Sequence, residues 1–311
     1  MNTYEHKKTH NKDLFRVVDR DGNWTHYFHA PSKKYLRAVN YILDIGYAKG
    51  IYFHRWLLSK SSDEAEKILK YAGDRGDRVH KAIAFLLEKG KIGRWERVYD
   101  DEKKTDVPLE NGDWDCMLAF QSFWNRHEPI LISKEESVYD VDHGYAGTFD
   151  AVIKLTKSCE VRSCRCNEFV GKVGLYDWKS SGGIYPNHGA QVAAYNFAGG
   201  AGRAEYTAIL RVGTNHKLTG GYEFQPYDVN QTATHFMEFL AAKQIADAEY
   251  HPFDPGVEIY DVPDIVEIIE KKEEIKVEPK ESEPKETPIE KSKKARKPRK
   301  VAKKKKKTQR A

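Results

Sequence analysis

The sequence lacks the features of an integral membrane protein and of a disulfide-stabilised secreted protein. No apolar run approaches the roughly 20 residues of a membrane span, and the N-terminus has no signal-peptide core. Only four of the 311 residues are cysteine, too few for a disulfide scaffold in a chain of this length. The chain also has no internal repeat. These absences predict a cytoplasmic protein that makes no membrane contact.

Acidic residues are missing from the end of the chain. Residues 291–311 contain 13 Lys or Arg and no Asp or Glu, so of the net charge of +5 the first 290 residues carry 5 minus 13, or −8. From about residue 263 onward Glu, Lys and Pro dominate, and such a composition cannot bury enough apolar surface to fold. We therefore predict a disordered tail over 263–311 that is basic from 291.

The rest of the chain is rich enough in apolar residues for one substantial domain, with 40% hydrophobic and 12% aromatic residues overall. We predict an N-terminal segment, 1–31, with a small hairpin (15–18 and 24–28), followed by a domain over 32–262. Predicted helices cover 32–58, 62–87 with a break near Gly73 and Gly76, 114–127, the region around Gln191, and 230–248. Predicted strands cover 136–141, 146–155, 173–179, 205–212 and 222–226. The fold class is α/β or α+β, a central mixed sheet flanked by helices with a helical N-terminal part.

One predicted strand ends in charged residues. Residues 173–179 are rich in β-branched and aromatic side chains and lie between turn-forming segments, which predicts a strand. Because residues two apart in a strand point to the same face, Asp177 and Lys179 share a face. They could form a plain surface ion pair. In a site, Asp177 would hold a cation while the Lys179 ammonium orients a water or offsets developing charge.

An earlier strand supplies a second carboxylate. Asp150 follows apolar Phe149 in the strand pattern of residues 144–155, and a partly buried Asp there needs a cation or a hydrogen-bond donor. Antiparallel pairing of the two strands would place Asp150 near Asp177. Two carboxylates suit Mg²⁺, with Mn²⁺ as a substitute, because Mg²⁺ takes few protein carboxylates and keeps several waters.

Five short motifs, each weak alone, occur in the order found in one nuclease superfamily. They are the histidine of Arg75-Gly76-Asp77-Arg78-Val79-His80, the glutamate Glu136, the Gly-x-x-Asp ending at Asp150, the Asp-x-Lys of Asp177 and Lys179, and the Gln-x-x-x-Tyr of Gln191 and Tyr195. Over roughly residues 32–260 the chain resembles the PD-(D/E)XK nuclease superfamily, which has a restriction-endonuclease-like core, and more closely its RecB-like and phage exonuclease branch.

The resemblance implies roles for the matching residues. Asp150, Asp177 and Lys179 would be catalytic. The metal ligands would be both aspartates, the backbone carbonyl of Trp178 and, as an accessory ligand, His80. Gln191 and Tyr195, one helical turn apart, would contact a DNA strand or order the site, although both also fit a plain helix. His80 equally fits a helix core or surface. Glu135 and Glu136 are adjacent, and Glu136 is chosen as the motif glutamate by its distance to Asp150.

The sequence departs from the family pattern between the two strands. Asp150 and Asp177 are separated by 26 residues, whereas the commonest hairpin loops have about 2 to 5. The excess, residues 156–172, is predicted to be an inserted excursion, and it carries Cys159, Cys164 and Cys166. These thiols could bind zinc with a fourth ligand. Their spacing matches no standard zinc signature, so we predict reduced cytosolic thiols.

The resemblance implies a Mg²⁺-dependent DNA nuclease, exonuclease-like, acting in recombination, repair or phage DNA processing. It would work at the nucleoid or in the cytoplasm of a phage-infected host, with DNA and a single-strand annealing or recombination protein as partners. The lysines of the tail would tether DNA without reading its sequence, and a solubilising tail or a localisation signal are the alternatives. The tether lysines are Lys303, Lys304, Lys305, Lys306 and Lys307. An RNA nuclease would share the site chemistry, and a nucleic-acid-binding scaffold without turnover is the alternative function.

Overall fold

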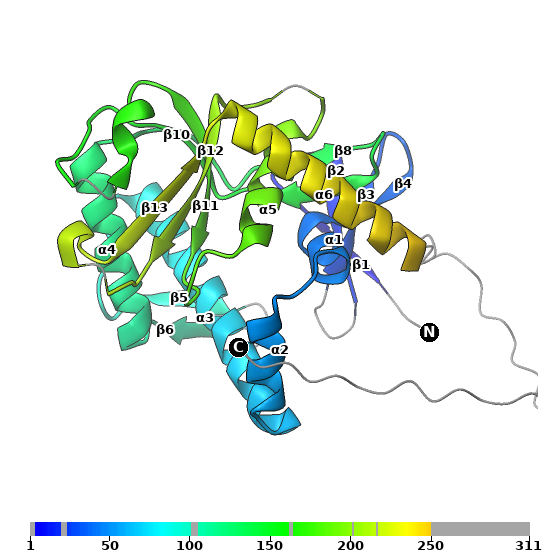
Figure 1. Cartoon of the computed structure of the whole chain (residues 1–311), viewed down its shortest axis with the longest axis horizontal. Helices are drawn as coiled ribbons and strands as arrows, with labels where there is room; N and C mark the ends of the chain where they lie inside the picture. The colour runs from blue at the N-terminus through cyan, green and yellow to red at the C-terminus, as the bar shows by residue number, and fades with distance from the viewer. Residues whose placement is uncertain are drawn as a thin grey trace, which may run out of the picture. The chain divides into compact units, whose positions relative to one another are not determined.

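The computed structural model describes residues 4–19, 24–100, 105–161, 164–200, 202–215 and 217–249. The described part is an α+β structure with six helices and mixed sheets, as the sequence predicts at that level (Figure 1). The predicted tail over 263–311, with its tether lysines, lies outside the described residues. No helix of the described part is long and apolar enough to span a bilayer.

A five-stranded sheet forms the centre of the structure. Its order is β13-β12-β11-β10-β7, and the strands are β7 (Ile130–Lys134), β10 (Ala151–Lys154), β11 (Val173–Lys179), β12 (Tyr206–Val212) and β13 (Tyr222–Tyr227). The pair β11 and β12 is parallel and the other neighbours are antiparallel. Helix α5 (Pro186–Phe197) connects the parallel pair, as the predicted crossover helix does. The antiparallel pairing of β10 with β11 confirms the predicted pairing of the strands around Asp150 and Asp177.

Helices cover both faces of this sheet (Figure 1). On one face α3 (Ser62–Lys89) and α4 (Asn111–His127) pack against a core that includes Phe120, Phe123, Tyr176 and Trp178. On the other face, α5, α6 (Val229–Glu249) and α1 (Val39–Gly46) pack against Leu175 and Ile209. The alternation along β11 therefore sends Tyr176 and Trp178 to the first face and Leu175 and Asp177 to the second.

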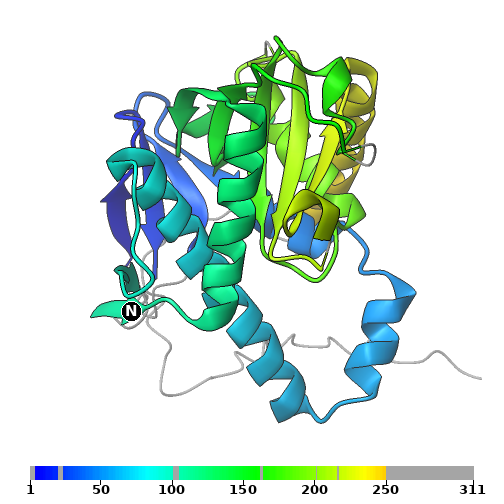
Figure 2. The same ribbon diagram turned by 90° about the vertical axis from the view of Figure 1, so that its left-hand side faces the viewer.

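A second sheet has six strands in the order β1-β2-β3-β4-β9-β8. Its strands are β1 (Glu5–Lys8), β2 (Leu14–Val18), β3 (Trp24–His29), β4 (Lys34–Ala38), β8 (Ser137–Asp140) and β9 (Tyr145–Thr148). The predicted N-terminal hairpin is present as β2 and β3, and it continues through β4 to the parallel strand β9. Figure 2 shows the blue strands of this sheet, β1 to β4, beside the green-to-yellow strands of the central sheet.

One two-stranded ribbon belongs to both sheets. Its first strand runs from β7 to β8 and its second from β9 to β10, so that each changes sheet midway. At the change, Glu135 N–H donates to the Asp150 carbonyl (2.9 Å) and Phe149 N–H donates to the Glu136 carbonyl (3.1 Å). We call these four residues the ribbon corner. Because of it, the strand predicted over 146–155 is interrupted at Phe149 and Asp150.

Two helix predictions are wrong in part. Residues 34–38 form β4 rather than the start of a helix over 32–58, because pairing with β3 on one side and β9 on the other outweighs the local pattern. The remainder divides into α1 and α2 (Ile51–Leu58) at residues 47–50. The short strands β5 (Arg97–Asp100) and β6 (Thr105–Pro108), like β1 and β7, carry too weak a pattern to be predicted.

The predicted break near Gly73 and Gly76 is absent, because α3 is one continuous helix of 28 residues. A Cβ added at Gly73 would have no heavy atom within 4 Å, so no close approach requires glycine there. We expect Gly73→Ala to raise the free energy of unfolding by about 0.5–1 kcal/mol, since alanine loses less backbone entropy in a helix. Urea unfolding of both proteins measures this. A destabilised variant would mean that the helix bends at Gly73.

Candidate active site

Strand β11 delivers Asp177 and Lys179 to the α5 face of the central sheet. Asp177 is 2% exposed and its Oδ2 lies 2.6 Å from Lys179 Nζ. Its Oδ1 accepts a hydrogen bond from Gln191 Nε2 at 3.2 Å. Burial raises the pKa of Asp177, and Lys179 opposes that increase. Neighbouring positive charge and hydrogen bonds to its oxygens both favour the ionised form of such a buried carboxylate.

Asp150 reaches the same place from the ribbon corner. Its Oδ2 accepts the backbone N–H of Trp178 at 2.6 Å, and its Oδ1 lies 3.0 Å from His80 Nδ1. The two aspartates therefore flank residue 178 of β11, one through the backbone and the other as its neighbour in sequence. The structure brings Asp150, Asp177 and Lys179 together, as the two strand predictions require.

His80 comes from α3 and faces Asp150, with its side chain 31% exposed. Burial acts to lower the pKa of His80, but the negative charges of Asp150 and Asp177 outweigh burial and raise the pKa to about 9. The imidazolium is thus the resting form at neutral pH. His80 can act as a metal ligand only after it loses a proton, because both ring nitrogens of an imidazolium are donors.

Helix α5 places Gln191 and Tyr195 on one face, directed to the site. Gln191 Nε2 donates to Tyr195 Oη at 3.1 Å as well as to Asp177. The Tyr195 ring packs on Gly147, where a Cβ would lie 2.3 Å from Tyr195 Cε1. That close approach explains why the strand leading to Asp150 carries glycine at this position. Gln191 therefore contacts Asp177 directly, and Tyr195 contacts Gln191.

Two further predicted site residues, Glu136 and Trp178, have their backbone atoms beside the site. Glu136 belongs to the ribbon corner, next to Asp150, and in the described part of the chain neither its side chain nor that of Glu135 makes an ion pair. The Trp178 N–H points to Asp150, and the N–H and C=O of one strand residue point to the same edge, so the Trp178 carbonyl also faces that side.

Sequence reasoning missed two residues near the site. Asn40 in α1 accepts a hydrogen bond from Tyr195 Oη at 3.4 Å. The two residues are 155 positions apart, and no local sequence pattern identifies Asn40 as a site residue. His188 in α5 accepts the Tyr185 N–H at 3.2 Å. Burial, together with the charge of Lys179, lowers the pKa of His188 to about 3. His188 is therefore neutral beside Lys179. Its position in the first turn of α5 was the feature of the sequence that could have pointed to it.

The chemistry of the donors fits a hard divalent cation. Asp177 Oδ2 is buried, and its close partner among the described residues is the Lys179 ammonium, 2.6 Å away. A carboxylate oxygen in contact with one donor still has a lone pair that a cation can accept. Together with Asp150, Asp177 supplies carboxylate oxygens, the ligand type that Mg²⁺ and Mn²⁺ prefer.

Comparison with known proteins gives no relative: no model of a protein family matches the chain, and no curated protein sequence matches it. The interpretation of the site rests on its own geometry.

Proposed function

We propose that the protein is a metal-dependent nuclease that hydrolyses phosphodiester bonds of DNA, with a restriction-endonuclease-like core of the PD-(D/E)XK type. The observation that carries the proposal is the convergence of Asp150, Asp177 and Lys179 from adjacent antiparallel strands. A plain ion pair would account for Lys179 with Asp177. It does not explain a second carboxylate and a histidine placed against the same strand end.

The residues have separate roles in this proposal. Asp150 and Asp177 would hold Mg²⁺ or Mn²⁺, which when bound supplies positive charge to the scissile phosphate and acidifies an attacking water. The Lys179 ammonium, 18% exposed, offsets negative charge that develops on the phosphate oxygens. Gln191 fixes the rotamer of Asp177, so that the carboxylate needs no reorganisation.

The interior position of the site favours a strand end or a flexible strand as substrate. Asp177 is almost fully buried and Lys179 is mostly buried, so a substrate phosphate has little open surface through which to reach them. Exonuclease-like action fits this burial, and a role in DNA recombination, repair or phage DNA processing stays a prediction from the sequence. DNA tethering by the basic tail, and a recombination protein as partner, stay predictions from the sequence.

Cleavage of end-labelled linear DNA and closed circular DNA, each single- and double-stranded, tests the proposal. We expect loss of linear substrate with Mg²⁺ or Mn²⁺, no loss with EDTA, and intact circles. Cutting of circles would make the enzyme an endonuclease, and cleavage of RNA alone would reassign the substrate. Metal-independent activity, or none on any substrate, would overturn the proposal and favour a nucleic-acid-binding scaffold.

A further inference from the structure

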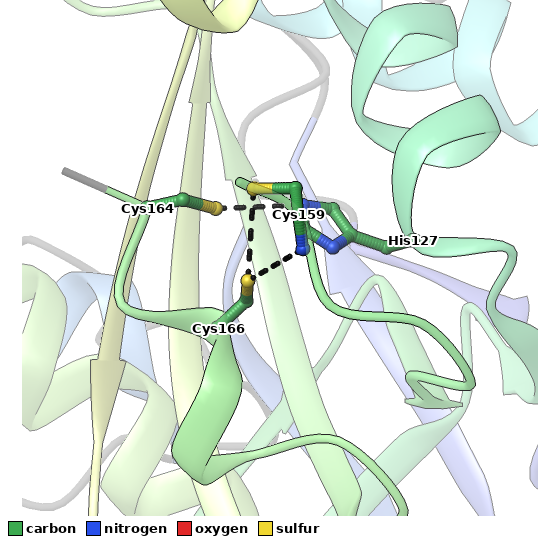
Figure 3. A group of neighbouring side chains, drawn as sticks. All are labelled: His127, Cys159, Cys164 and Cys166. Atoms are coloured by element: carbon green, nitrogen blue, oxygen red, sulfur yellow. Dashed lines mark hydrogen bonds between the residues drawn. The ribbon is translucent and has the colours of Figure 1, made fainter. Parts of the chain in front are cut away.

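A second group of side chains with metal-binding chemistry lies at the other end of β10. Cys159, Cys164 and Cys166 from the connection between β10 and β11 meet His127 from the last turn of α4 (Figure 3). One ligand atom from each of the four lies within 4.8 Å of every other. We propose that these residues bind one Zn²⁺ ion as a structural Cys₃His site, which is separate from the carboxylate site and does not depend on the proposed function.

Two of the six distances between ligand atoms match tetrahedral zinc, and all six are 4.8 Å or less. With Zn–S bonds of roughly 2.3 Å and Zn–N bonds of roughly 2.0–2.1 Å, tetrahedral angles put two sulfurs about 3.8 Å apart and sulfur and nitrogen about 3.6 Å apart. The Sγ atoms of Cys159 and Cys166 are 3.7 Å apart, and Cys164 Sγ is 3.4 Å from His127 Nε2. All four cysteines of the chain are free, so no disulfide competes for these sulfurs.

The histidine is oriented as a zinc ligand requires. His127 Nδ1 lies 3.1 Å from the Lys157 carbonyl, which can only accept, so Nδ1 carries the proton and Nε2 keeps its lone pair. That lone pair is on the side of Cys164. A backbone carbonyl that fixes the tautomer in this way is the usual outer partner of a metal-bound histidine.

The sulfurs also have supporting donors. Cys159 N–H donates to Cys166 Sγ at 3.3 Å. Without an ion, the Tyr222 hydroxyl donates to His127 Nε2 at 3.0 Å, and when zinc takes that lone pair the hydroxyl would donate to Cys164 Sγ, 3.6 Å away. Cys164, Cys166 and His127 are buried, whereas Cys159 is partly exposed. A surface pocket lined by residues 159–161 and 165–167 gives an ion a route to the sulfurs.

The position of the cluster defines what the ion would do. Backbone N–H groups of Thr156 and Lys157 donate to the His127 carbonyl, so the connection already contacts the end of α4 there. A zinc ion coordinated by His127 of that helix and by the three cysteines would link α4 to each of them. The described residues of this connection, 155–161 and 164–172, have little regular structure of their own beyond the short helix Cys166–Glu168. The ion would therefore fix the inserted connection to α4.

The choice of zinc over a harder ion follows from the donors. Three thiolates and one imidazole select soft or borderline ions with tetrahedral geometry, whereas Mg²⁺ requires oxygen ligands. The cluster also leaves no position for a substrate once four protein ligands are engaged, which is the pattern of structural sites.

Metal analysis of the full chain, purified without a polyhistidine tag or chelator, tests the proposal. We expect one zinc ion per wild-type chain, loss of zinc in Cys159→Ser, and retained zinc in the control Cys116→Ala, whose thiol lies in α4 beside Arg75 of α3. Asp177→Asn should keep its zinc, which separates this outcome from the nuclease test. Folded wild-type protein without zinc, or with iron instead, would overturn the proposal, as would zinc retained by Cys159→Ser.

Cobalt substitution supplies a second readout that does not depend on variant folding. Co²⁺ added to metal-free wild type should give thiolate-to-cobalt charge-transfer absorption and the intense visible bands of tetrahedral cobalt. Zinc removal should also lower the thermal midpoint by several degrees, and added Zn²⁺ should restore it. Weak octahedral cobalt bands would contradict the proposal.

Discussion

Asp177→Asn and Lys179→Met should each reduce metal-dependent cleavage about 10³-fold or more without unfolding the protein. The loss follows because each removes several kcal/mol of charge stabilisation at the phosphate, and about 1.4 kcal/mol corresponds to tenfold in rate. Burial raises the pKa of Asp177, so its ionised form costs stability that grows as pH rises from the unfolded pKa to the folded pKa. Asparagine removes that cost but leaves the Lys179 ammonium without its partner, so the thermal midpoint of Asp177→Asn should stay within a few degrees of that of wild type.

Two surface residues give matched controls. Asp142 lies in the exposed turn of the ribbon and Lys172 lies just before β11, so Asp142→Asn and Lys172→Met make the same chemical changes away from the site. Single-turnover cleavage and thermal unfolding of all four variants decide the matter. Wild-type cleavage by Lys179→Met would remove the lysine from the mechanism.

Asp113→Ala should lower the free energy of unfolding by about 3–5 kcal/mol, the usual cost of leaving a buried charge without its partner. Asp113 in α4 is fully buried and accepts from Arg78 Nε at 2.8 Å and from Arg78 Nη2 at 3.4 Å. It also accepts the Glu110 N–H at 2.9 Å, which caps α4. Arg78 lies two residues before His80, so we expect slower cleavage as well.

The exposed Asp115, on the same helix, supplies the comparison. Asp115→Ala should change stability by no more than about 0.5 kcal/mol, as surface substitutions usually do. Urea unfolding of both variants measures the difference. Equal stabilities would show that the pair of Arg78 and Asp113 contributes nothing net to the fold.

The carboxylate site was predictable because short strand patterns in the sequence determine where its side chains point. A strand pattern places Asp177 and Lys179 on one face, and a second strand pattern brings Asp150 to the neighbouring position. The ribbon corner was not predictable, since the change of sheet at Phe149 and Asp150 depends on the pairing of distant strands. Asn40 was missed for the same reason, because its contact with Tyr195 spans 155 positions.

The cysteine cluster shows where spacing along the sequence fails as a guide. Three cysteines in the insertion matched no zinc signature, and reduced thiols were the prediction. The fourth side chain of the cluster, His127, comes from a different element, 32 positions before Cys159, and nothing around it in sequence marks it as a partner. Only the fold brings the end of α4 to the insertion. The helix over 114–127 was predictable, and the meeting of its end with these thiols was not.

The N-terminal sheet has a consequence for the order of folding. Strand β4 needs β9 as its neighbour, and Arg37 in β4 donates to the Ala246 carbonyl in α6, 209 positions away. During synthesis, one edge of β4 stays unpaired until β9 has left the ribosome. Arg37 cannot make its hydrogen bond to Ala246 until α6 has been synthesised. Such long loop closures are slow, and an open strand edge invites wrong pairing in the meantime. The early strands therefore complete their folding late, and this interval is when a nascent chain most needs a chaperone.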